Sequence, residues 1–70
     1  MNIRPSKLKA GDKVICDRRV MTFVSRQASP YCSTRCVFRC DDYVGMNGAK
    51  DKGECWMSDN YVVRHCRRLS

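Results

Sequence analysis

The stretch that decides the fold reads LKAGDKVIC and covers residues 8–16. Gly11 and Asp12 form a turn signal, and the residues from Lys13 onward follow the two-residue period of a half-buried strand. This period places Val14 and Cys16 on the same face of the strand. We therefore expect a β-rich domain that begins with this turn and strand.

Two further segments have the composition of strands. Residues 20–26 are rich in β-branched and aromatic side chains, and the Ala-Ser-Pro sequence of residues 28–30 ends that run. Residues 54–58 are predicted to form another short strand, after a long loop over residues 45–53 that contains three glycines.

A third predicted strand covers residues 35–41 and has two different faces. Alternation puts Cys36, Phe38 and Cys40 on one face of it, and Val37 and Arg39 on the other. Phe23 and Phe38 are expected in the core, together with one of Trp56 and Met57, because a chain this small has few large apolar side chains with which to build one.

The sequence period changes after residue 58. Asp59 or Asn60 is predicted to cap a helix, since both side chains accept hydrogen bonds from helix N-termini. Val62, Cys66 and Leu69 then recur at helical spacing. Four to five short strands followed by one or two helical turns predict a mainly β fold, a small antiparallel barrel with a short C-terminal helical turn.

Both ends of this pattern resemble the small SH3-like barrels. In that family a strand of pattern L-x-x-G-D-x-V precedes a meander of strands, and residues 8–14 match this pattern. The Met-Ser-Asp-Asn-Tyr-Val sequence of residues 57–62 is similar to the family's closing segment, so the resemblance covers about a fifth of the chain. The six cysteines and the long glycine loop depart from the family pattern. The resemblance implies a fold and leaves the activity open, because such barrels serve many binding roles.

Length and composition exclude several classes of protein. Seventy residues make a single domain, in which we expect residues 1–6 to be flexible and residues 7–69 to form the barrel with its closing turn. Such a chain is too short for TIM barrels and doubly wound nucleotide folds. It has no apolar run of about 20 residues and no secretory signal, so we expect a cytoplasmic protein without a membrane partner.

The net charge of +7 is unevenly distributed along the chain. Residues 1–40 hold nine Lys and Arg against two Asp, residues 41–60 hold two Lys against five Asp and Glu, and residues 61–70 add three Arg. Clustered basic residues favour a nucleic-acid partner, because cations that neutralise phosphates release counterions. The predicted contacts are Lys7, Lys9, Lys13, Arg18, Arg19, Arg64, Arg67 and Arg68, and the predicted stacking rings are Tyr31 and Tyr43. The alternative reading of these cations is a solvated surface without a ligand.

A second function class is protein binding. The acidic middle of the chain, residues 41–59, contains Tyr43 and Met46 beside the glycine loop and can serve as a recognition edge. Small size, basicity and the absence of a catalytic motif resemble the small accessory proteins of bacteriophages and prophages. That resemblance implies an inhibitor or adaptor that binds a host protein.

The six cysteines allow three interpretations. A structural zinc is one, with Cys32, Cys36, His65 and Cys66 as ligands, provided that the residues between Cys32 and Cys36 make a turn. Reduced thiols that fill space are the second, and they suit the cytoplasm. One or more disulfides are the third. A zinc-stabilised structural domain is therefore a further candidate function.

No catalytic constellation is evident. The single histidine, His65, adjoins Cys66 in sequence, and neighbours on a helix point about 100° apart, so they do not form a dyad with each other. P-loop, GxSxG, HExxH and GxGxxG motifs are absent from the sequence. We expect a small, basic, non-enzymatic binding module that takes no small-molecule substrate.

Overall fold

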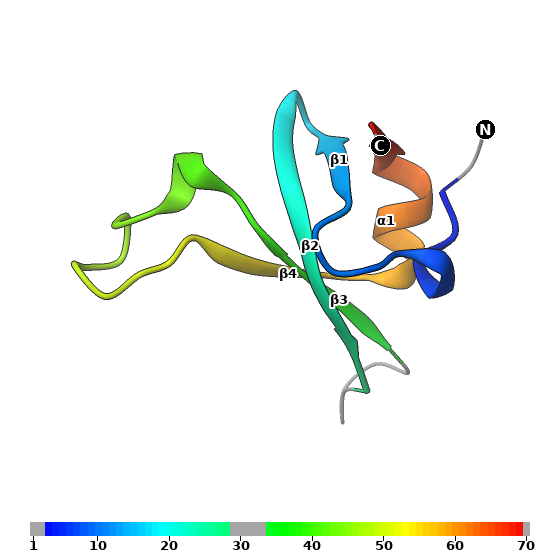
Figure 1. The fold of residues 1–70 in the computed structure, drawn as a ribbon, viewed down its shortest axis with the longest axis horizontal. Coiled ribbons are helices and arrows are strands. Elements are labelled where there is room, and N and C mark those ends of the chain that lie inside the picture. The colour runs from blue at the N-terminus through cyan, green and yellow to red at the C-terminus, as the bar shows by residue number, and fades with distance from the viewer. Residues whose placement is uncertain (1–2, 29–33, 70) are drawn as a thin grey trace.

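The computed structural model describes residues 3–28 and 34–69. These residues form one antiparallel sheet with a short helix packed beside it (Figure 1). The strands are β1 (Lys13–Cys16), β2 (Arg19–Gln27), β3 (Arg35–Arg39), β4 (Glu54–Ser58) and β5 (Cys66–Arg68). The helices are α1 (Asp59–His65) and the 3-10 turns η1 (Pro5–Lys7) and η2 (Asp41–Tyr43).

The strand order is β4-β3-β2-β1-β5. The first four strands follow one another as a meander, and the chain then crosses through α1 so that β5 pairs with β1. The mainly β prediction with four to five strands is therefore confirmed. Within the described residues, β4 and β5 are the two ends of an open sheet, and no pairing joins them.

The predicted turn and strands lie where the sequence period places them. Val14 and Cys16 are buried on β1, and Cys36 and Phe38 are buried on β3. The connection between β1 and β2 is a two-residue hairpin turn. Both of its residues have positive φ angles, 52° at Asp17 and 67° at Arg18. That geometry matches the right-handed twist of a hairpin and normally selects glycine or asparagine.

The C-terminal helix is shorter than the sequence predicts. Ser58 caps it, because its Oγ accepts a hydrogen bond from the Tyr61 N–H at 3.2 Å, so the prediction of Asp59 or Asn60 as the cap is wrong. The helix ends at His65, and Cys66 has extended φ and ψ angles of −108° and 150°. Pairing with β1 takes residues 66–68 into the sheet, so the helical spacing of Cys66 and Leu69 was misleading.

The core lies between the concave face of the sheet, η1 and α1 (Figure 1). Phe23 and Phe38 meet edge to face with ring centroids 5.6 Å apart, as their predicted core positions require. Of the alternative pair, Met57 packs against the core while Trp56 is 55% exposed. The remaining buried hydrophobic residues are Ile3, Leu8, Val14, Cys16, Met21, Cys36, Cys40, Val62 and Cys66. Four cysteines thus fill core space, as small apolar side chains do.

The N-terminal residues contribute to this core. Ile3 and Pro5 are buried, and η1 contacts α1. Residues 1–6 were expected to be flexible, whereas the described part of that segment packs on the domain.

Candidate functional site

An open groove of about 1330 Å³ runs between η1, the end of α1 and β5. Its cationic side chains come from the two ends of the chain. Arg4 and Lys7 belong to the η1 segment, Arg64 lies in the last turn of α1, and Arg67 and Arg68 lie on β5. The other lining residues are Ile3, Val63, His65, Cys66 and Leu69.

The local fold explains why these cations meet. The helix ends at His65, where basic side chains are favoured by the partial negative charge of a helix C-terminus. Ile3 and Pro5 are buried, which holds the η1 segment and its two cations against α1. The described residues that line the groove include no Asp or Glu. The groove therefore presents positive charge that no carboxylate within its lining neutralises.

Four of the eight predicted basic contacts line this groove: Lys7, Arg64, Arg67 and Arg68. Arg68 also forms an ion pair with Asp12 at 3.0 Å, which fixes its guanidinium at the groove edge. Arg4 was missed, since it stood alone in a segment expected to be flexible. The signal that identifies it is the Pro5 that follows, which starts a 3-10 turn and anchors the segment.

The other four predicted basic residues lie outside the groove lining. Lys13 Nζ donates to Thr22 Oγ1 at 2.8 Å across the sheet. Arg19 pairs with Asp42 at 3.1 Å and covers the Tyr43 ring, 5.2 Å from its centroid. Lys9 lies in the turn before β1, and Arg18 lies at the tip of the β1–β2 hairpin. Four of the eight predicted residues therefore do not contribute to this groove.

The predicted stacking rings have different outcomes. Tyr31 lies outside the described residues. Tyr43 is half-buried, packs against the core and carries Arg19 on its ring. Among the described Phe, Trp and Tyr side chains Trp56 is the most exposed, and its ring lies under Arg35 at 5.3 Å. Sequence reasoning had assigned it to a pair of core candidates.

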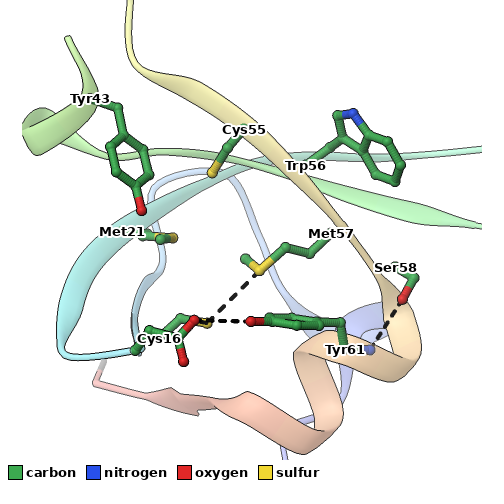
Figure 2. A pocket seen from close by; sticks show the side chains of 9 residues that line it. Cys16, Met21, Tyr43, Cys55, Trp56, Met57, Ser58 and Tyr61 are labelled. Atoms are coloured by element: carbon green, nitrogen blue, oxygen red, sulfur yellow. Dashed lines mark hydrogen bonds between the residues drawn. The ribbon is translucent and has the colours of Figure 1, made fainter. Parts of the chain in front are cut away.

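A second hollow, an apolar pocket of about 470 Å³, is lined by residues of β1, β2, β4 and the start of α1 (Figure 2). Tyr61 points across it from the helix, and its hydroxyl donates to Asp17 Oδ2 at 2.9 Å. This hydrogen bond raises the pKa of Tyr61. The other lining residues are Cys16, Met21, Tyr43, Cys55, Trp56, Met57 and Ser58. Met46 is 69% exposed and does not line the pocket.

The predicted zinc ligands have the following positions. Cys36 is buried, and its Sγ donates to Asp59 Oδ1 at 3.3 Å. Burial and the Asp59 carboxylate raise the pKa of Cys36 to about 12, so the thiol is neutral at pH 7. His65 is exposed with its ring 4.3 Å from that of Tyr61, and Cys66 is buried beside Cys16.

Cys32 lies outside the described residues, so the full ligand set is not on view. In residues 3–28 and 34–69, no three His, Cys, Asp or Glu side chains are grouped closely enough to hold a metal ion.

Comparison with protein families, curated proteins and solved structures finds no match to this chain. No helix in the described part of the chain is long and apolar enough to cross a membrane.

Proposed function

We propose that this protein is a small non-enzymatic binding module that holds the phosphate backbone of a nucleic acid in its basic groove. The observation that carries the proposal is the gathering of Arg4, Lys7, Arg64, Arg67 and Arg68 from the two ends of the chain around a hollow whose described lining has no carboxylate. Guanidinium groups suit this role, because their planar forks donate two hydrogen bonds to one phosphate.

The energetics favour binding that depends strongly on salt. If Arg4, Lys7, Arg64 and Arg67 each neutralise one phosphate of a duplex, the logarithm of the association constant falls with the logarithm of salt concentration with a slope of about −3.6. Contacts of this kind position a protein without reading sequence. The expected ligand is therefore any duplex or single strand, with little preference among sequences.

The proposal includes an SH3-like barrel as the scaffold. Support comes from the meander of β1 to β4, the return of β5 to the side of β1, and the helix that separates β4 from β5. The groove lies where β5 follows α1, so the closing segment of the domain supplies most of its cations. We place the protein in the cytoplasm, where buried thiols remain reduced.

An electrophoretic gel shift with random-sequence DNA and RNA, each double- and single-stranded, tests the proposal at about 50 and 200 mM salt. Retardation is expected at the lower salt and loss of most of it at the higher. The variant Arg64→Glu/Arg67→Glu should abolish the shift. Lys50→Glu/Lys52→Glu makes the same charge change in the exposed loop, outside the groove, and should retain it. No retardation of the wild-type protein at the lower salt contradicts the proposal.

The apolar pocket favours a second candidate, an inhibitor or adaptor that binds a host protein. Trp56 and Tyr61 are both exposed at its rim, 55% and 38% respectively, and aromatic side chains of this kind anchor protein interfaces. A pull-down from bacterial lysate with wild-type protein and with Trp56→Ala tests this function. A specific partner captured only by the wild-type protein supports it, and equal capture by both excludes the pocket.

A structural zinc held by Cys32, Cys36, His65 and Cys66 is the remaining proposal. Native mass spectrometry should then find one zinc per chain, removed by a chelator together with the fold. An unchanged melting curve in chelator leaves the thiols as ordinary core side chains.

A further inference from the structure

Two cysteines lie opposite each other in the sheet. The register of β1 and β5 pairs Cys16 directly with Cys66. The other described cysteines have different partners, since Cys36 lies opposite Met57 and Cys55 lies opposite Phe38. Of the five cysteines that the structure describes, Cys16 and Cys66 are therefore the two that lie directly opposite each other in the sheet.

The hydrogen bonds of β5 show which kind of pair this is. The Leu69 N–H donates to the Lys13 carbonyl at 2.9 Å, and hydrogen-bonded pairs alternate along an antiparallel ladder. The position of Cys16 and Cys66, three residues along, is therefore a non-hydrogen-bonded pair. The Cys66 N–H confirms this, because it donates to the Val62 carbonyl of the helix instead.

Such positions have the geometry that a disulfide needs. At a non-hydrogen-bonded pair the Cα atoms lie about 4.5 Å apart and the side chains are at their closest. Disulfides span Cα separations of about 4.4–6.8 Å. Both side chains are buried, and the register places them on the same side of the sheet. The Cys16 Sγ donates to Asp17 Oδ2 at 3.9 Å and to Met57 Sδ at 3.8 Å, so its present partners are a carboxylate and a thioether.

The pair also lies between the two hollows of the molecule. Cys16 lines the apolar pocket and Cys66 lines the basic groove, although both side chains are buried, 1% and 5% exposed. Figure 2 shows Cys16 at the floor of the pocket, beside Met57. Cys16 is therefore the member of the pair that a small oxidant in the pocket can reach, and Cys66 lies opposite it in the sheet.

We propose that Cys16 and Cys66 are a redox-active pair that hydrogen peroxide converts to a disulfide, which covalently ties β5 and its groove arginines to β1. The Cys16 sulfur attacks one peroxide oxygen, the O–O bond breaks, and a sulfenic acid and one water form. The Cys66 sulfur then attacks the Cys16 sulfur, the S–O bond breaks, and the S–S bond forms with loss of a second water. Two thiols thus lose two electrons and two protons, which reduce one peroxide to two waters.

The geometry sets the order of these steps. Cys16 lines the apolar pocket, so its sulfur is the one that an oxidant in the pocket reaches, and Cys66 is its neighbour in the register of β1 and β5. Burial raises the pKa of both thiols, so little thiolate exists at pH 7 and the reaction is slow there.

The test is mass spectrometry of the full chain after treatment with hydrogen peroxide and alkylation under denaturing, non-reducing conditions. We expect a monomer that alkylates at four of its six cysteines, with the two unmodified sulfur atoms joined and two hydrogens lost. Trypsin should release residues 14–18 linked to residues 65–67, and dithiothreitol should separate them. The melting temperature should rise by at least about 10 °C, since the bond closes a loop of about 50 residues.

Two variants serve as controls. Cys66→Ala should lose the cross-link, while Cys55→Ala should form it to the same extent as wild type. If Cys66→Ala does not fold, the tryptic peptides of the oxidised wild-type protein show by themselves which cysteines are linked. A cross-link that joins other cysteines, an intermolecular dimer, or sulfinic acid at Cys16 without a cross-link would each overturn the proposal. The assay contains no nucleic acid, so its result is independent of the proposed groove function.

Discussion

The two hollows flank the same helix, and they differ in what surrounds their charged groups. The basic groove gathers five cations and no carboxylate among its described lining residues, although Arg68 pairs with Asp12 from outside that lining, whereas Arg19 and Arg35 beside the apolar pocket both contact a carboxylate or a ring. Arg19 pairs with Asp42 and covers Tyr43, and Arg35 covers Trp56. Net charge therefore overstates the number of cations that are available to a ligand. Position relative to carboxylates and rings decides which cations can bind.

Gly53→Ala should cause the largest loss of stability, and it should disturb the apolar pocket more than the basic groove. Gly53 has a φ of +81°, and a Cβ there would collide with the Cys40 carbonyl oxygen and crowd Val44, which leads out of η2. Because η2 supplies Tyr43 to the pocket, the damage should fall on the pocket side. We expect a loss of about 3 kcal/mol in the free energy of unfolding, measured by urea denaturation.

Gly48→Ala is the matched control for that substitution. Gly48 also has a positive φ, +125°, but a Cβ there meets open space. Its cost should be limited to backbone strain, about 1 kcal/mol. Equal losses for the two variants would show that the close approach to Cys40 has no effect.

Val62→Ala should cause the second largest loss of stability and should disturb both the pocket and the groove. Val62 is fully buried and holds α1 on the core, while its neighbours line the hollows, Tyr61 the pocket and Val63 the groove. We expect a loss of about 2 kcal/mol, seen as a fall of about 10 °C in melting temperature. Val63→Ala removes the same atoms from a side chain that is 37% exposed and should cost less than about 0.5 kcal/mol. A larger loss at Val63 than at Val62 contradicts this packing.

Arg18→Gly should raise stability and leave groove binding unchanged. Arg18 holds a φ of 67° at the hairpin tip, where glycine has no steric cost. A gain of about 1 kcal/mol is expected in chemical denaturation. Arg18→Ala removes the same charge without relieving the backbone and should show no gain. A loss of nucleic-acid affinity in both variants would extend the interface beyond the groove.

Asp59→Asn should give the smallest effect, present at neutral pH and lost in acid. The hydrogen bonds from Arg26 and Cys36 lower the pKa of Asp59, although burial opposes them. A folded pKa below the unfolded value of about 3.9 gives stability that is present above pH 4 and is lost as pH falls through the folded pKa. The variant should therefore be less stable than wild type at pH 7 and should converge with it near pH 2 in thermal melts. Arg26→Ala should behave alike, and a constant difference from pH 7 to pH 2 would disprove the linkage.

Strands β1 and β3 were predictable from their two-residue period, and β2 from its β-branched and aromatic composition. Val14 and Cys16 on β1, and Cys36 and Phe38 on β3, alternate inward as local sterics require. Strand β5 was not predictable, since its three residues continue a helical spacing and only pairing with β1 takes them into the sheet. Tertiary contact overrides local pattern there.

The cations of the basic groove could be predicted only in part, for a related reason. Arg64, Arg67 and Arg68 cluster in sequence, and sequence proximity carried over into space. Arg4 joined them only through the burial of Ile3 and Pro5, and Arg19 left the set because Asp42 lies across from it in the fold. The pairing of strands decides which carboxylate lies near which cation. This pairing cannot be deduced from a single sequence.

The central claim is that the groove cations bind phosphates, and the salt dependence of binding tests it most directly. The association constant of a random duplex should be measured from about 50 to 300 mM salt for wild type, Arg64→Ala/Arg67→Ala and Lys50→Ala/Lys52→Ala. We expect a slope of about −3.6 for wild type and the loop variant, and about −1.8 for the groove variant, because two phosphate contacts are lost. Identical slopes for all three proteins would contradict it.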